Sequence, residues 1–188
     1  MLVIWQHRED TEFVKQMWKG LDDVTVLECS DKHHLTHSEI RRALQKEKDM
    51  IIFAGHGDNY GLYYPDFDIH YSAGYLIDSS VVQFLRGKTV IAIWCYASDF
   101  CIKYDLCGFS TSMFISEETE AVQCGFSNAT QEDIRHECDL FFNRINQLLI
   151  DKIPTSEWAG ILQKQADMTK PFVRYNYEAL CSLPEIDE

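Results

Sequence analysis

Short apolar runs alternate along the chain with stretches in which apolar residues recur at helical spacing. Runs of about four to eight consecutive apolar residues are typical of strands buried on both faces. They predict strands at residues 1–5, 24–29, 49–55 and 88–95. Apolar positions three and four residues apart indicate helices that bury one face. They predict helices at residues 10–20, 36–48, 78–86, 117–125 and 130–150.

Two stretches break this alternation. Residues 56–77 are rich in Gly, Asp and Tyr and are predicted to be a loop that could contain a hairpin. Residues 96–110 are predicted to be a second loop, followed by a fifth strand at 112–116. Long loops in compact domains often carry function, so the first stretch is a candidate functional segment.

The alternation of strands and helices predicts the fold class. Buried strands separated by helices indicate an α/β fold with a mainly parallel central sheet covered on both faces. A length of 188 residues fits one domain over 1–188. The pattern does not place residues 151–188, which are expected to be a helical or irregular C-terminal extension. In such sheets ligands bind at the carboxyl ends of the strands.

Composition and charge narrow the functional class. Hydrophobic residues make up 46% of the chain and charged residues 25%, as in folded globular proteins. The net charge of −13 argues against a nucleic-acid partner held by phosphate contacts, and it would suit a basic partner. No apolar run reaches the roughly 18–20 residues of a membrane span, so no membrane partner is expected. The oligomeric state is not indicated.

Cysteine usage bears on location and on metal binding. Seven cysteines, an odd number, and a first segment without the features of a secretory signal favour a reducing, cytoplasmic location. Cys95, Cys101 and Cys107 match no common zinc spacing, and the histidines within residues 33–37 have no partner pair. Neither a metal nor a cofactor is expected, and nothing in the sequence indicates a dependence on calcium.

Candidate chemistry follows two of the predicted strands. His56 comes directly after the strand MIIFA, between Gly55 and Gly57, and Cys95 comes after VIAIW. If these strands are neighbours in a parallel sheet, an imidazole and a thiol emerge side by side. A histidine can take the proton of such a thiol, which makes the sulfur a nucleophile. The backbone N–H groups of Gly57 and Cys95 would then stabilise an oxyanion.

At these residues the chain resembles the caspase-like cysteine peptidases. The family places a His–Gly pair after one apolar strand and its cysteine after another, and MIIFAGHG and TVIAIWC stand here in that order. The stretch GFSTSMFIS, residues 108–116, lies where the family has its next core strand. The resemblance covers roughly residues 1–150. It implies a three-layer caspase-like sandwich, with His56 as general base and acid and Cys95 as the nucleophile that cuts a peptide bond through a thioester.

The residues around the cysteine depart from the patterns that set specificity in the family. IWCYAS differs from the QAC-plus-Gly pattern of animal caspases, so a preference for Asp is not implied. Members that prefer basic residues can carry an acid two positions before the cysteine, where this chain has Ile93. A pocket for a basic side chain of a peptide or protein substrate could instead use Asp99, Trp94 and Asp58.

Three interpretations therefore stay open. The first is a cysteine peptidase, whose Cys95 should react with iodoacetamide faster than the other six thiols. The second is a catalytically inactive member of the same fold that acts as a binding or regulatory module, and the bulky Trp94 beside the thiol favours it. The third is an unrelated doubly wound α/β domain with a ligand at its switch point. A buried thiol at a strand end is also common as inert core.

Overall fold

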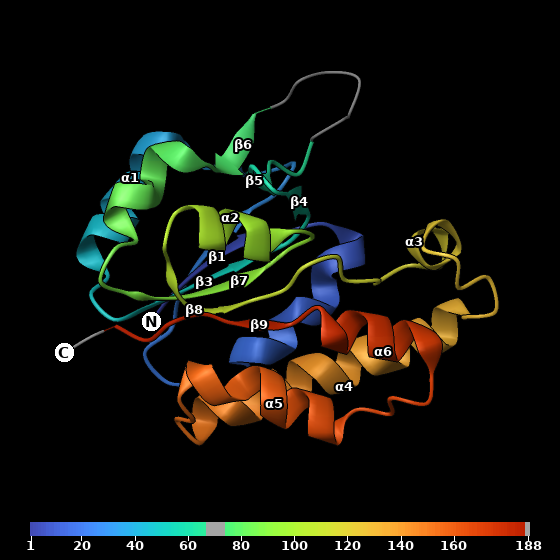
Figure 1. The fold of residues 1–188 in the computed structure, drawn as a ribbon. Coiled ribbons are helices and arrows are strands. Elements are labelled where there is room, and N and C mark those ends of the chain that lie inside the picture. Colours follow the sequence, from blue (N-terminus) through green and yellow to red (C-terminus); the bar gives the residue numbers. More distant parts are fainter. Residues whose placement is uncertain (67–73, 187–188) are drawn as a thin grey trace.

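A six-stranded sheet forms the centre of the computed structural model, which describes residues 1–66 and 74–186 (Figure 1). Its strand order is β2–β1–β3–β7–β8–β9. The first five strands in this order are parallel, and β9 is antiparallel to β8. An α/β fold with a mainly parallel sheet is thereby confirmed. The strands are β1 (Leu2–Gln6), β2 (Thr25–Cys29), β3 (Met50–Ala54), β7 (Thr89–Ile93), β8 (Cys107–Ser110) and β9 (Cys181–Ser182).

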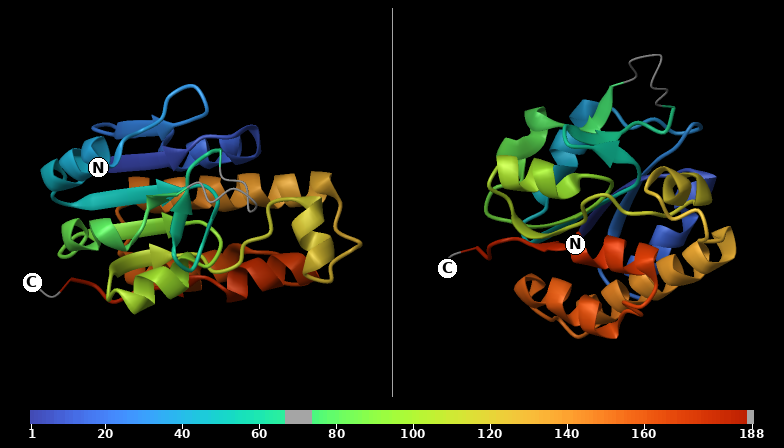
Figure 2. Two further views of the ribbon diagram at one scale, coloured as in Figure 1. Left: turned by 90° about the horizontal axis from the view of Figure 1, so that it is seen from above. Right: turned by 45° about the vertical axis from the view of Figure 1, so that its right-hand side comes forward.

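Helices cover both faces of the sheet, as Figure 2 shows. Alternate residues of β1 point to opposite faces, so Val3 and Trp5 join one apolar core while Leu2 and Ile4 join the other. The first core is closed by η1 (Glu9–Trp18), α4 (Gln131–Ile150), α5 (Thr155–Gln165) and α6 (Pro171–Glu178). The second is closed by α1 (His37–Lys46), η2 (Ser79–Phe84) and α2 (Ala97–Lys103). This layering is compatible with a three-layer sandwich. No helix in the described residues is both long and apolar enough to cross a membrane.

The expected helices are present, with two of them wound as 3-10 helices. These are η1 and η2, which fall in the stretches 10–20 and 78–86. The helix expected at 36–48 begins at a capping box, in which Thr36 accepts from the backbone N–H of Glu39 and the Glu39 carboxylate accepts from that of Thr36. The helix expected at 117–125 is α3 (Glu118–Gln123), at one end of the molecule.

The prediction for residues 96–116 is wrong in two places. The stretch 96–110 contains α2 and β8 instead of a loop, and the fifth strand is β8 instead of residues 112–116. The apolar run at 112–116 misleads because Phe114 and Ile115 fill the core from an irregular segment. The side chain of the buried Asn176 takes the place of a neighbouring strand, since it accepts from the N–H of Ile115 at 2.8 Å and donates to its carbonyl at 2.9 Å.

A small second sheet follows β3. It is antiparallel and joins β4 (Gly57–Asp58), β5 (Gly61–Tyr63) and β6 (Tyr75–Ile77), which agrees with the hairpin expected in residues 56–77. Residues 67–73 of that stretch lie outside the described residues.

The C-terminal stretch completes the sheet. The extension expected at 151–188 is helical in α5 and α6, and it ends in β9, which the pattern did not predict. The N–H of Ser112 donates to the Ala179 carbonyl, and the N–H of Leu183 donates to that of Gly108 at 2.8 Å. The tail is therefore part of the sheet edge beside β8.

Three thiols with raised pKa values should make the fold sensitive to alkali. Burial raises the pKa of Cys95, Cys101 and Cys138 from an ordinary value of 9.0 to about 12. Between these values the unfolded chain loses the protons and the folded chain keeps them. The free energy of unfolding should therefore stay level below pH 9 and fall as the pH rises toward 12, by roughly one kcal/mol per pH unit for each thiol.

Urea unfolding at about pH 8 and about pH 10.5 measures this loss. The midpoint should drop at the higher pH, and Cys138→Ala should make the drop smaller. An equal drop in that variant would contradict the assignment to buried thiols.

Candidate active site

His56 and Cys95 lie at the ends of two neighbouring strands. In the β3–β7 pair Ala54 is opposite Ile93. His56 and Cys95 each follow two positions later, so they leave the sheet at the same level. The N–H of Gly55 donates to the Ile93 carbonyl at 3.1 Å and prolongs the pairing toward the site. Both residues line one cavity of about 30 Å³, room for about one water molecule. The structure thus brings the two predicted residues together.

Gln6, at the end of β1, holds the backbone of His56 in place. The Gln6 side-chain oxygen accepts from the N–H of His56 at 2.6 Å, and its amide donates to the Tyr64 carbonyl. Gly55 makes this contact possible because a Cβ there would lie 2.5 Å from that oxygen, and its φ of +145° suits glycine. The histidine turn is therefore fixed by the neighbouring strand.

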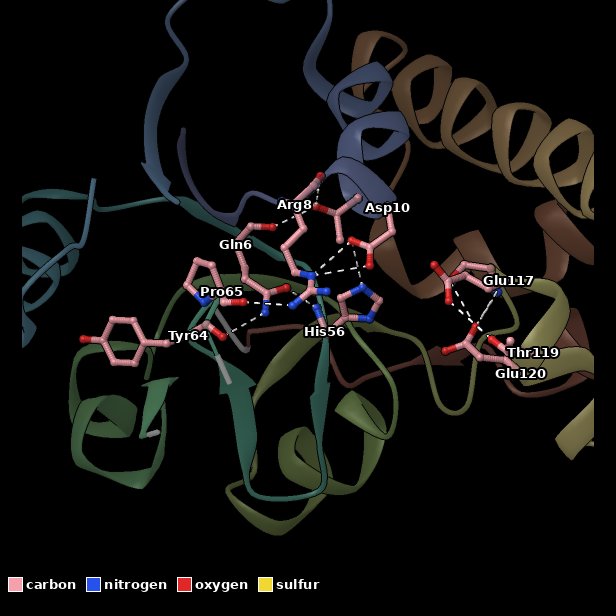
Figure 3. Close-up of polar contacts among 11 residues, drawn as sticks. Gln6, Arg8, Asp10, His56, Tyr64, Pro65, Glu117, Thr119 and Glu120 are labelled. Atoms are coloured by element: carbon pink, nitrogen blue, oxygen red, sulfur yellow. Dashed lines mark hydrogen bonds and ion pairs between the residues drawn. The ribbon is translucent and has the colours of Figure 1, made fainter. Parts of the chain in front are cut away.

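Asp10 lies against the imidazole, a contact that sequence reasoning missed. Its Oδ1 is 3.3 Å from Nε2 of His56, which is an ion-pair contact (Figure 3). The contact with His56, with help from the charge of Arg8, holds the pKa of Asp10 below its usual value against the opposing effect of burial. Arg8 also donates to the Pro65 carbonyl at 2.9 Å. Asp10 is in the first turn of η1, the helix that follows β1. Its place just beyond the carboxyl end of a predicted strand is the feature of the sequence that could have indicated a role at the site.

Cys95 holds its thiol in the neutral form. The sulfur donates to the Phe114 carbonyl at 3.7 Å, and burial together with the charge of Glu120 raises its pKa to about 12. The Glu120 carboxylate accepts from the N–H of Ser116 at 2.8 Å. This hydrogen bond holds the carboxylate against the segment whose Phe114 carbonyl receives the thiol. The next residue, Tyr96, has a left-handed φ of +64° and caps α2. A non-glycine residue in this region is uncommon and is a sign of a functional turn.

Gly57 and Trp94 pack against each other beside the site. A Cβ on Gly57 would lie 2.3 Å from Cδ1 of Trp94, so glycine is needed for that contact. The Trp94 ring is buried, packs edge-on against Phe53 and Phe100, and donates from Nε1 to the Asp58 carbonyl at 2.9 Å. Trp94 lines the small cavity while its ring belongs to the core.

The two acids expected in a substrate pocket are not placed together. Asp58 holds the β4–β5 turn, where Oδ1 accepts from the N–H of Tyr60 at 2.7 Å and Oδ2 accepts from the Tyr75 hydroxyl at 3.0 Å. Asp99 is exposed in the first turn of α2 and is not among the residues around the His56–Cys95 cavity. The observed contacts therefore give neither carboxylate a role in that cavity.

Comparison with known protein families and with characterised proteins gave no match. Within residues 1–66 and 74–186, no group of three or more His, Cys, Asp or Glu side chains is arranged to hold a metal ion.

The environment of Cys95 reverses the alkylation rate expected from the sequence. Iodoacetamide reacts with thiolates, and Cys95 is neutral near pH 7.5 because its pKa is about 12. All three of Cys95, Cys124 and Cys181 are half-buried residues, and we expect the raised pKa to make Cys95 in the resting protein the slowest of them to be alkylated. Peptide mapping by mass spectrometry after timed alkylation measures the seven rates. Fastest labelling at Cys95 would mean that His56 already holds its proton.

Proposed function

We propose that the protein is a cysteine peptidase of caspase-like type that cuts peptide bonds with Cys95 and His56. The observation that carries the proposal is their common position at the ends of β3 and β7, around one cavity. Asp10 adds a third group, since its carboxylate faces Nε2 and leaves Nδ1 as the nitrogen that can accept a proton. The sharp turn at Tyr96 supports a nucleophile at this place. The seven free thiols fit a reducing compartment such as the cytoplasm.

The reaction proceeds through a thioester in this proposal. As the sulfur of Cys95 attacks the peptide carbonyl, its proton passes to His56, which then gives it to the leaving amine. Water, deprotonated by His56, releases the new carboxylate and restores the thiol. The N–H groups of Gly57 and Cys95 are the proposed donors to the oxyanion. Asp10 positions the ring and stabilises its charged form.

A neutral resting thiol is consistent with this sequence of steps. The proton leaves the sulfur only during attack, so no free thiolate has to exist beforehand. The cavity of about 30 Å³ is too small for a peptide, so the chain of the substrate has to lie over its mouth. Substrate binding thus precedes activation of the thiol.

Electrophilic peptides test the proposal directly. A panel of peptidyl acyloxymethyl ketones, with Lys, Arg, Asp, Asn or Leu before the ketone, samples the residue at the cut. At least one member should alkylate Cys95, as located by mass spectrometry. Cys95→Ala should give no adduct at this site, and His56→Ala should slow the labelling by about 100-fold or more. Adducts that form only at other thiols, or none with the whole panel, would contradict a peptidase.

The small volume of the cavity favours one alternative, a catalytically inactive module of the same fold that binds peptides. The carboxylate of Glu120 and burial both work against ionisation of the thiol, as expected for a cysteine without a chemical role. Such a module would bind the panel peptides reversibly, with equal affinity before and after Cys95→Ala, and would not form the covalent adduct.

Asp10 provides a further prediction for the peptidase. Asp10→Asn keeps the size of the side chain but removes the charge beside His56, so kcat should fall by roughly 10- to 100-fold while KM changes little. Steady-state kinetics on a cleaved panel peptide measure both constants. Glu9→Gln is the matched control, since Glu9 is an exposed neighbour in the same helix. Equal effects of the two exchanges would show that Asp10 does not position the ring.

A further inference from the structure

A larger cavity lies between the loop that joins α3 to α4 and the start of α6. Its volume is about 460 Å³, in the range of small-ligand sites. Figure 1 shows α3 and the first turns of α4 and α6 gathered at one end of the molecule, and Figure 2 shows that the parallel strands point toward this end. The apolar wall consists of Phe126, Ala129, Pro171 and Phe172.

The two charged groups that line this cavity differ in their partners. The ammonium of Lys170 binds the carboxylate of the buried Glu137 at 2.9 Å. Asp133 accepts from the Thr130 hydroxyl at 2.7 Å at the start of α4. The Lys170 ammonium already has an anionic partner, and the exposed Asp133 carboxylate is solvated and disfavours an acidic ligand, so the cavity suits a neutral, apolar group.

Exposed aromatic side chains connect the cavity with the candidate active site. Tyr96 follows the nucleophile directly and is 43% exposed, and Tyr175 of α6 is 37% exposed. The Tyr175 ring meets the Phe126 ring edge-on, with centroids 5.4 Å apart. Burial raises the pKa of Tyr175, and the proximity of Cys124, Tyr96 and Cys95 raises it further. Tyr175 therefore packs on the cavity wall and lies near enough to Tyr96 and Cys95 to be affected by their charges.

The helix beside the cavity is also fastened to the segment that contacts the thiol. Asn176 follows Tyr175 and binds both backbone groups of Ile115. Phe114, one residue earlier, receives the thiol of Cys95 at its carbonyl. Cavity and nucleophile are thus linked through the buried contacts of Phe114, Ile115 and Asn176.

We propose that this cavity binds an aromatic or large aliphatic side chain of the peptide whose bond Cys95 cuts. The inference rests on the proposed function and adds a determinant of specificity to it. An extended peptide advances about 3.3 Å per residue, so a chain lying over Tyr96 and Tyr175 would place in the cavity a side chain other than the one at the cut. The apolar wall and the Lys170–Glu137 pair favour an uncharged side chain.

Binding of small amides tests the cavity without any need for catalysis. N-acetylphenylalanine amide, N-acetylleucine amide and N-acetylalanine amide are titrated into the ¹⁵N-labelled Cys95→Ala variant. The first two should shift the amide signals of residues 125–129 and 172 in a saturable way, and the alanine compound should shift them at least 10-fold more weakly. Equal responses to all three, or shifts that map elsewhere, would overturn the inference.

Blocking the mouth of the cavity provides the second measurement. Asn128→Trp fills it from an exposed position and leaves the core unchanged, and Asn143→Trp makes the same exchange at an exposed site of α4 that does not line the cavity. Asn128→Trp alone should abolish the amide shifts. In the active protein it should also remove, from a profile of cleaved peptides, a preference for aromatic or aliphatic residues at one position away from the cut.

The outcomes separate the two proposals. Cleavage with the same preference in Asn128→Trp and in the unsubstituted protein would overturn the assignment of the cavity and leave the peptidase standing. Saturable amide binding without cleavage of any peptide or labelling of Cys95 would overturn the peptidase and support the ligand class of the cavity.

Discussion

Replacing Cys95 by alanine is expected to abolish peptide hydrolysis, with a fall in kcat/KM of about 10⁴-fold or more. The proposed mechanism has no other atom that could form the thioester, and removing a nucleophile from such a site leaves only the contribution of substrate positioning and the oxyanion donors. Hydrolysis of a fluorogenic form of the best panel peptide measures the loss. His56→Ala should cause a loss of similar size, and the double variant should be no worse than either single one.

Cys181→Ala is the matched control for the nucleophile. Cys181 is a free, half-buried thiol in β9, away from the cavity that His56 and Cys95 share. Its replacement should leave kcat/KM within about twofold, as for a cysteine outside the reacting group. Activity that survives in Cys95→Ala, or additive losses in the double variant, would show that these two side chains do not act as one unit.

The pairing of His56 with Cys95 could be predicted from the sequence because it depends on the sheet alone. Two apolar strands of equal length are each followed, two positions later, by a reactive residue. Whenever such strands are parallel neighbours, the two reactive residues lie at adjacent positions. The register of β3 and β7 confirms that placement. Asp10 could not be predicted in the same way, because its contact with His56 spans three elements and depends on how η1 turns back over the end of β1.

The errors in the fold have a common physical cause. An apolar run predicts that its residues are buried. It does not show which other part of the chain supplies hydrogen bonds to their backbone N–H and carbonyl groups. Phe114 and Ile115 are buried in an irregular segment because Asn176, about 60 residues later, supplies the hydrogen bonds that a strand would have made. The two-residue strand β9 is too short to produce a pattern, and it forms because α6 ends beside β8. The raised pKa of Cys95 likewise depends on how deeply the thiol is buried, which the spacing of residues along the sequence does not reveal.

Gly108→Ala is the change with the largest expected effect on stability. Gly108 is in β8 opposite Val90 of β7, with a φ of +127° that disfavours any side chain. A Cβ there would lie 2.2 Å from the Val90 carbonyl oxygen, and backbone in the middle of a sheet cannot move away cheaply. We expect the free energy of unfolding to fall by at least about 3 kcal/mol, since the strain of the conformation adds to the clash.

Urea unfolding of Gly108→Ala and Gly160→Ala side by side measures the effect. Gly160 is exposed in α5 with nothing near its Cβ position, so the same exchange there should stabilise the protein by up to about 1 kcal/mol. A loss below about 1 kcal/mol in Gly108→Ala would contradict the close approach of β7 and β8. That approach also positions the proposed nucleophile, because Thr111, just after β8, donates from its hydroxyl to the Trp94 carbonyl at 2.9 Å. Any Gly108→Ala protein that still folds should therefore have a displaced Cys95. Its proposed peptidase activity should fall by more than the fraction of the protein that is unfolded.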